Sequence, residues 1–303
     1  MIGESAAIRK TIEQAKLFAE TDYSLLLVGE TGTGKEIFAQ SIHNNSKRCN
    51  GPWVVVNCAA LPENILESEL FGYVGGAFTG ANKDGKPGLF EVAHGGTIFL
   101  DEIAEMDYVN QGRLLRVLQE KTVVRLGSYK VLPIDVRVIA ATNKDLDLLI
   151  RENKFRIDLY YRLNVLCLNI MPLRERKEDI KLFIGKFLRE FYNISGRTLR
   201  LTNDTIKFLE EYNWPGNIRE LKNLVQRITV TAKVDTITCE MIKEILHSKE
   251  TIPVLSTREN RQVKEIREAL KEAKGNCTAA ARILGIHRMT LHRRIKKLNI
   301  DDY

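Results

Sequence analysis

Paired cysteines and long apolar runs are both missing from this sequence. Its five cysteines, at positions 49, 58, 167, 239 and 277, lie far apart, and none has the C-x-x-C spacing of a zinc site. The longest apolar stretches have the length of a strand, and the N-terminus lacks the basic flank and apolar run of a signal peptide. We therefore expect a protein of the reducing cytoplasm with no membrane partner.

Acidic residues are absent from one segment, which runs from residue 276 to residue 300. The same segment carries most of the formal net charge of +7. Its basic residues are Arg282, Arg288, Arg293, Arg294, Lys296 and Lys297. The basic character therefore belongs to the C-terminus rather than to the body of the chain.

Short β-rich runs alternate with helix-length segments through the first 170 residues. They cover residues 25–28, 54–57, 97–100, 136–140 and 165–169. This alternation predicts an α/β domain over residues 1–172, with a parallel sheet and helices on both faces. Later residues show apolar positions at steps of three and four, which predicts an all-α domain over residues 173–247. A polar linker over residues 248–258 and a last all-α domain over residues 259–303 complete the chain.

The first predicted strand leads directly into a glycine-rich loop and a helix. The loop consists of Gly29, Glu30, Thr31, Gly32, Thr33, Gly34 and Lys35. Glycines let the backbone amides turn toward phosphates, the helix N-terminus adds positive potential, and Lys35 reaches the β- and γ-phosphates. Glu36 stands where a Ser or Thr usually supplies a hydroxyl for Mg²⁺, so other groups must hold the metal. The segment predicts a site for a nucleoside triphosphate and Mg²⁺.

Polar residues end two later strands of the predicted sheet. Asp101 and Glu102 follow an apolar strand, where the first can hold Mg²⁺ and the second can polarise a water. Asn143 follows the next strand, where it can sense the γ-phosphate, since the C-terminal ends of parallel strands line one crevice. Without the phosphate loop, Asp101 and Glu102 would be interpreted as solvated acids at the end of a strand, and Asn143 would be interpreted as a helix cap. Beside the phosphate loop, we expect all three in the nucleotide site.

These elements together resemble the AAA+ ATPases. A further segment resembles the GAFTGA loop of the activators of sigma-54 RNA polymerase. It consists of Gly76, Ala77, Phe78, Thr79, Gly80 and Ala81. Small residues around one Phe make a mobile tip with an apolar contact, although a plain glycine-rich hairpin would have the same composition. The resemblance implies that this loop contacts sigma-54.

The resemblance to sigma-54 activators extends over essentially the whole chain and implies further roles. Asn57 matches the residue that links γ-phosphate sensing to the catalytic glutamate, and Glu36 matches the family's usual residue after the lysine. Arg156 and Arg162 match the arginine-finger segment and would reach the γ-phosphate of a neighbouring subunit. Arg219 matches the second sensor of the helical lid. Residues 73–75 depart from the family's common His-Glu-Lys.

The last domain has the pattern of a helix-turn-helix and resembles the Fis-type domain of many sigma-54 activators. Thr278 can cap its second helix, Gly285 supplies the turn, and a third helix follows from residue 288 to residue 298. Five side chains of this third helix remain for the DNA. They are Arg288, His292, Arg293, Lys296 and Lys297. A charged solvated helix is the alternative interpretation.

The resemblance implies an ATPase that binds enhancer-like DNA and remodels closed promoter complexes of sigma-54 RNA polymerase. The family assembles into rings, usually hexamers, with dimeric DNA-binding units. One alternative is a general AAA+ remodeller or replication loader, which would lack the hexapeptide. Another is a regulator of ordinary polymerase with a vestigial ATPase domain, against which the intact Lys35, Asp101, Glu102 and Arg162 argue. Because residues 2–5 resemble the start of the family's ATPase domain, we expect either an excised fragment or control by a separate protein.

Overall fold

The computed structural model describes residues 3–80, 82–232 and 234–247 and parts of the C-terminal segment, namely residues 266, 269, 270, 273, 276–286 and 289–291. The chain forms two compact units, Met1–Ile242 and Lys243–Tyr303. Among the described residues, every helix is too short or too polar to cross a lipid bilayer.

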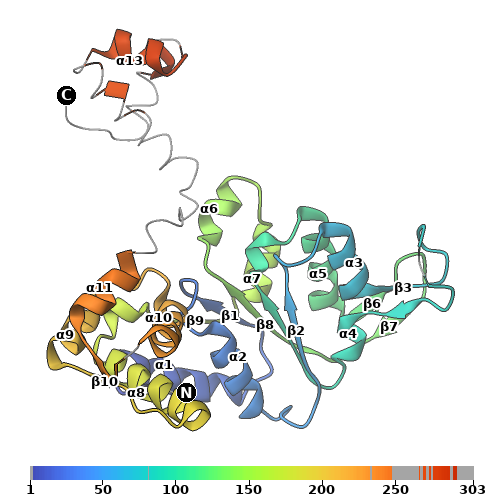
Figure 1. Cartoon of the computed structure of the whole chain (residues 1–303). Coiled ribbons are helices and arrows are strands. Elements are labelled where there is room, and N and C mark those ends of the chain that lie inside the picture. The colour runs from blue at the N-terminus through green and yellow to red at the C-terminus, as the bar shows by residue number, and fades with distance from the viewer. Residues whose placement is uncertain are drawn as a thin grey trace. The chain divides into compact units, whose positions relative to one another are not determined.

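A five-stranded parallel sheet forms the centre of the first unit (Figure 1). Its strand order is β2-β5-β8-β1-β9, and all neighbouring pairs are parallel. The strands are β1 (Leu25–Val28), β2 (Trp53–Asn57), β5 (Thr97–Asp101), β8 (Arg137–Thr142) and β9 (Leu166–Asn169). The predicted parallel sheet is confirmed, with strand ends that differ from the expected ones by no more than two residues.

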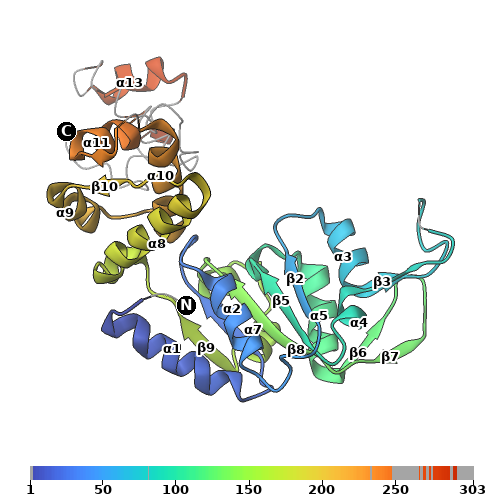
Figure 2. The same cartoon turned by 60° about the horizontal axis from the view of Figure 1, so that its bottom comes forward.

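Helices cover both faces of this sheet because successive side chains of each strand point to opposite sides. In β1, Leu25 and Leu27 pack with α1 (Ala6–Ala19) and α2 (Lys35–Asn44). Leu26 points to the other face, which carries the remaining helices of the domain. These are α3 (Glu63–Phe71), α4 (Leu89–Val92), α5 (Tyr108–Glu120), α6 (Leu146–Arg151) and α7 (Ile157–Leu163). The predicted three-layer arrangement is confirmed, as Figure 2 shows.

Two small hairpins extend from the second face. One pairs β3 (Gly72–Tyr73) with β4 (Lys86–Pro87), and the other pairs β6 (Thr122–Val124) with β7 (Val131–Pro133). An isolated bridge joins Tyr73 to Leu126, so the hairpins support each other. In Figure 1 they project from the sheet at the side where α3 and α4 lie. A hairpin at residues 76–81 was only an alternative interpretation, and the β6–β7 hairpin was not predicted, because its strands have three residues each and show no alternation.

A mainly helical subdomain completes the first unit. It contains α8 (Glu178–Ser195), α9 (Asn203–Glu211), α10 (Asn217–Thr231) and the start of α11 (Cys239–His247). A short 3-10 helix, η2 (Leu173–Glu175), connects it to the sheet, and η1 (Ile103–Glu105) follows β5. The fully buried Trp214 donates its indole N–H to the carbonyl oxygen of Leu209 at 2.8 Å. The predicted helices are confirmed, and the structure adds a two-residue strand pair, β10 (Arg200–Leu201) with β11 (Thr236–Ile237).

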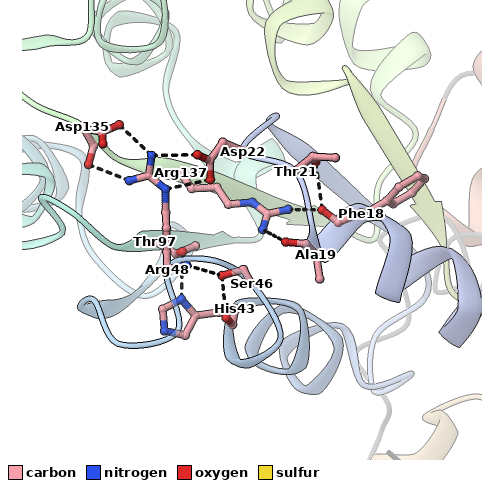
Figure 3. Close-up of polar contacts among 10 residues, drawn as sticks. All are labelled: Phe18, Ala19, Thr21, Asp22, His43, Ser46, Arg48, Thr97, Asp135 and Arg137. Atoms are coloured by element: carbon pink, nitrogen blue, oxygen red, sulfur yellow. Dashed lines mark hydrogen bonds and ion pairs between the residues drawn. The ribbon is translucent and has the colours of Figure 1, made fainter.

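Polar contacts fasten the loops at the N-terminal edge of the sheet (Figure 3). Arg137, the first residue of β8, is 1% exposed and donates to the carbonyl oxygens of Phe18 and Ala19 at the end of α1. Nearby, Arg48 pairs with Asp22 at 2.9 Å and with Asp135 at 2.8 Å. These contacts hold the edge opposite to the C-terminal ends of the strands, where the predicted site residues lie.

The described residues of the second unit include α13 (Cys277–Ile283) and a small core of Ile266, Leu270, Ala280 and Leu291 among others. Gly285 has a φ of +62°, which fits the predicted turn. The helix begins earlier than expected. Its cap is Asn276 rather than Thr278, because the Asn276 carboxamide oxygen accepts the amides of residues 278 and 279. The predicted linker, residues 248–258, lies outside the described residues.

Candidate nucleotide site

The phosphate loop connects β1 to α2 and leaves the start of that helix open. Gly32 and Gly34 have φ values of +81° and +101°, a region that favours glycine. A Cβ atom on Gly32 would lie 2.4 Å from the carbonyl oxygen of Gly216, so a side chain cannot be accommodated there. Gly34 caps α2 without a side-chain hydrogen bond. The first amides of α2 are therefore free of a side-chain cap and can receive an anion.

Lys35 lies inside this loop and is only 7% exposed. Its Nζ atom donates to the carbonyl oxygens of Gly29 at 2.8 Å and Glu30 at 3.3 Å. Burial lowers the pKa of Lys35, and the nearby Glu102 and Asp101 carboxylates partly oppose that shift. The cation is thus partly removed from water, which strengthens its attraction for a phosphate.

A cavity of about 470 Å³ collects most of the predicted nucleotide ligands. Thr31, Gly32, Thr33, Gly34, Lys35, Glu36, Asp101, Glu102 and Arg219 all line it. Apolar side chains form another part of the wall, among them Ile8, Phe183, Phe187 and Ile218. The cavity is therefore lined both by the charged residues of the phosphate loop and strand end and by mixed apolar and charged side chains of α8 and α10.

The two carboxylates at the end of β5 differ in their surroundings. Asp101 accepts the backbone amide of Glu102 at 3.0 Å. Glu102 has a φ of +51°, and its Oε2 atom is buried without a hydrogen-bond partner. Burial raises the pKa of Glu102, while Lys35 acts in the opposite direction. An orphaned carboxylate oxygen beside a second carboxylate and the phosphate loop fits a site for Mg²⁺ and a water.

The two asparagines of the predicted set lie at strand ends but do not line the 470 Å³ cavity. Asn143 follows β8 and donates from Nδ2 to the Oγ1 atom of Thr31 in the phosphate loop at 2.9 Å. Asn57 ends β2, and its Oδ1 atom accepts the amide of Ala59 at 2.9 Å. In this structure Asn143 contacts the phosphate loop, whereas Asn57 makes a local turn.

The two predicted finger arginines lie on or next to α7, away from the cavity of their own subunit. Arg156 forms a two-point ion pair with Asp158 and lies over the ring of Tyr108, 5.2 Å from its centroid. Arg162 is exposed and contacts the carbonyl oxygen of Leu118. This placement leaves both guanidinium groups outside the 470 Å³ cavity of the same chain.

The predicted partner loop lies between β3 and β4. Phe78 is 45% exposed, and its ring meets that of Tyr73 edge to face at 5.0 Å. Gly76 and Gly80 have positive φ values, and an added Cβ on either would meet no atom within 4 Å. Gly127 of the β6–β7 hairpin lies so close that its added Cβ would be 2.9 Å from that of Ala77. The loop is an open tip supported by the neighbouring hairpin; Ala81 lies outside the described residues.

Of the predicted DNA ligands, Thr278 lies within the described residues. Thr278 is exposed on α13, and its backbone amide donates to Asn276. Arg288, His292, Arg293, Lys296 and Lys297 lie outside the described residues. Their assignment to DNA stays a prediction.

Several residues that contact the phosphate loop were missed by the sequence reasoning. Asn217 is the first residue of α10, and its side chain donates to the carbonyl oxygen of Thr31 and to Glu30. Arg176 is buried and donates to the carbonyl oxygen of Thr33 at 3.1 Å. Arg174 pairs with Glu30. Basic residues at a domain junction are usually solvated, so the pattern alone gave no signal.

Three family models match the chain, and the second and third overlap at residues 257–271. The sigma-54 interaction domain matches residues 1–169, the AAA+ ATPase lid domain matches residues 174–271, and the Fis family of bacterial regulatory proteins matches residues 257–298.

Relatives with sequence similarity cover almost the entire chain. A protein of Geobacillus stearothermophilus named limonene hydroxylase is 47% identical over 97% of this chain and 55% of its own length. The transcriptional regulatory protein GlrR of Escherichia coli is 41% identical over 99% of this chain and 68% of its own. The crystal structure of Brucella abortus NtrX with ATP is 31% identical, with a TM-score of 0.73, over 98% of this chain and 69% of that chain. The chain spans about half the length of several curated relatives.

Proposed function

Because the chain belongs to the sigma-54 interaction domain family, we propose that it is an ATP-hydrolysing activator of RNA polymerase that carries sigma-54. The single observation that carries the proposal is the cavity that brings Lys35, Asp101 and Glu102 together in a subunit whose Phe78 loop is an exposed tip. The name limonene hydroxylase is not carried over, because the match covers only 55% of that relative's length.

In the proposed reaction, the loop amides and Lys35 bind the triphosphate and offset its charge. Glu102 orients and polarises the attacking water, and the burial that raises its pKa also makes its carboxylate a better proton acceptor. Asp101 and the phosphates would hold Mg²⁺, which supplies charge stabilisation to the transferring phosphoryl group when bound. Arg219 lines the same cavity from α10 and would report nucleotide occupancy to the lid.

Assembly into a ring, by analogy a hexamer, would complete the site. Arg156 and Arg162 lie away from their own cavity, so a neighbouring subunit is where they would stabilise the transition state. Turnover in the ring would then move the Phe78 loop against sigma-54 and remodel the closed promoter complex. The Fis-type domain would hold the ring at enhancer-like DNA in the cytoplasm, bound as dimeric units.

The test separates nucleotide binding from hydrolysis. Lys35→Ala removes the buried cation and should abolish ATP binding, whereas Glu102→Gln should bind ATP and fail to hydrolyse it. Binding is measured by calorimetry and turnover by phosphate release, and a cooperative melting transition shows that each variant is folded. Equal ATP affinity in Lys35→Ala and the unmodified protein would overturn the proposal.

A further inference from the structure

Glu30 is the only acidic residue in the phosphate loop, residues 29–35. Its side chain does not line the 470 Å³ cavity, which is called the phosphate cavity below. The five residues that follow it, from Thr31 to Lys35, all line the 470 Å³ cavity, whereas Glu30 lines a separate cavity of about 460 Å³. The backbone of Glu30 therefore belongs to the phosphate loop, while its carboxylate is turned to the other side.

Two groups from the lid side hold this carboxylate in place. Arg174 of η2 donates from Nη1 to Oε2 at 2.9 Å and from Nη2 to Oε1 at 2.7 Å. Asn217 of α10 donates to Oε2 at 3.1 Å and, from the same Nδ2 atom, to the carbonyl oxygen of Thr31. The hydrogen bond from Arg174, more than that from Asn217, lowers the pKa of Glu30 below its usual range. The carboxylate is therefore ionised and fixed by a two-point contact.

Lys35 lies on the opposite side of the same residue. Its Nζ atom is 3.3 Å from the backbone oxygen of Glu30, so a released Glu30 side chain could turn back and reach the ammonium group. Such an ion pair would occupy the cation that a phosphate needs. It would also bring a negative charge to the site that must accept a polyphosphate.

We propose that Arg174 is a positioning residue for nucleotide binding, which holds the Glu30 carboxylate away from Lys35 and keeps the phosphate site positive. The proposal rests on the proposed ATPase function. Arg174 would affect the binding of the triphosphate and not that of the nucleobase. In the described part of the chain its ion-pair partners are Glu30 and the adjacent Glu175.

The experiment uses the full chain and measures the Kd of Mg-ATP by calorimetry at fixed ionic strength. Arg174→Gln should weaken ATP binding roughly tenfold, since it frees an acidic side chain beside the phosphates. Glu30→Gln alone should bind at least as well as the unmodified protein. Adding Glu30→Gln to Arg174→Gln should restore the Kd to within about threefold of the unmodified value, because the competing charge is gone.

A matched control breaks another arginine ion pair of the lid. Arg197→Gln removes the contact with Asp235 at 2.8 Å and should leave the Kd of ATP unchanged. Melting temperatures measured without nucleotide show whether each variant folds. If Arg174→Gln does not fold, Arg174→Lys provides a milder change because it keeps the charge. Arg174→Lys should weaken ATP binding only about threefold.

An unchanged Kd in folded Arg174→Gln, or a double variant as weak as Arg174→Gln alone, would overturn the proposal while leaving the ATPase assignment intact. A purely structural role for Arg174 would give the second result. Failure of the ATPase assignment has a different signature, which is equal ATP binding by the unmodified protein and Lys35→Ala.

Discussion

Arg156 is held by Asp158, two residues further along the chain, through paired contacts of 3.1 Å from Nε to Oδ1 and 2.8 Å from Nη2 to Oδ2. These contacts raise the pKa of Arg156 and lower that of Asp158. Arg162, six residues away, donates to a single carbonyl oxygen among the described residues, that of Leu118, at 3.3 and 3.4 Å. Of the two arginines, Arg162 would therefore break weaker contacts in order to reach a neighbouring subunit.

The first prediction concerns this difference. Arg162→Ala should reduce ATP turnover by roughly a hundredfold or more, because arginine fingers carry that much transition-state stabilisation. ATP affinity should stay close to that of the unmodified protein, since Arg162 does not line the nucleotide cavity of its own chain. Lys154→Ala, which breaks an exposed pair with Glu152, is the control and should keep full turnover.

Mixed assemblies show whether Arg162 acts in a neighbouring subunit. Arg162→Ala subunits keep Glu102, and Glu102→Gln subunits keep Arg162, so one interface of a mixed assembly contains both intact groups. Partial recovery of turnover on mixing is expected. No recovery in assemblies shown to contain both subunits would argue against the role in trans.

The second prediction follows from the buried carboxylate of Glu102. Because burial raises its pKa above the usual value of 4.5, the folded protein binds more protons than the unfolded chain just above that pH. Stability from this group is present below pH 4.5 and is lost as the pH rises through the folded pKa. Glu102→Gln, which has no proton to lose, should melt at a higher temperature than the unmodified protein at pH 7. Scanning calorimetry without nucleotide should show the difference shrinking toward pH 4.5; a constant difference would contradict the assignment of the shift to burial.

The third prediction concerns the C-terminal segment. Removing residues 259–303 should abolish binding to DNA and leave most ATPase activity, because the basic excess lies there and the phosphate cavity lies in the first unit. In the full chain, the logarithm of the DNA affinity should fall with the logarithm of salt concentration by roughly one unit per phosphate contact. A flat response to salt, measured by fluorescence anisotropy, would count against DNA as the partner.

Much of the sheet could be predicted because its five strands are apolar runs bounded by loop residues. The phosphate loop and the Asp101-Glu102 pair follow the same logic, since parallel strands end at one edge. The contacts of Glu30, Arg174 and Asn217 could not be predicted in this way. They join segments more than 140 residues apart, and no local pattern records which basic side chain will meet which acid.

Local competition explains the smaller differences. Thr278 and Asn276 can both cap a helix, and the structure uses Asn276, whose carboxamide oxygen accepts two amides. Asn217 has the residue type of a cap but a φ of +52°, and tertiary contacts with the phosphate loop use its side chain instead. In both cases the helix was predicted and its end was decided by hydrogen bonds that the sequence leaves open.

The fourth prediction concerns the Phe78 tip, which is the part of the chain that only the sigma-54 assignment requires. Phe78→Ala shortens an exposed side chain and leaves Lys35, Asp101, Glu102 and Arg162 unchanged. Hydrolysis should therefore persist within a few fold of the unmodified rate. Thr79→Ala, at the neighbouring position, should behave in the same way.

The most direct measurement compares ATP turnover with sigma-54 capture and open-promoter formation in one preparation of Phe78→Ala. We expect ATP turnover to remain. Capture of sigma-54 in the presence of a transition-state mimic and promoter opening should both be lost, because a loop that moves without contacting sigma-54 exerts no force on it. Full promoter activation by Phe78→Ala, or unchanged capture of sigma-54, would contradict the account and favour a general AAA+ remodeller.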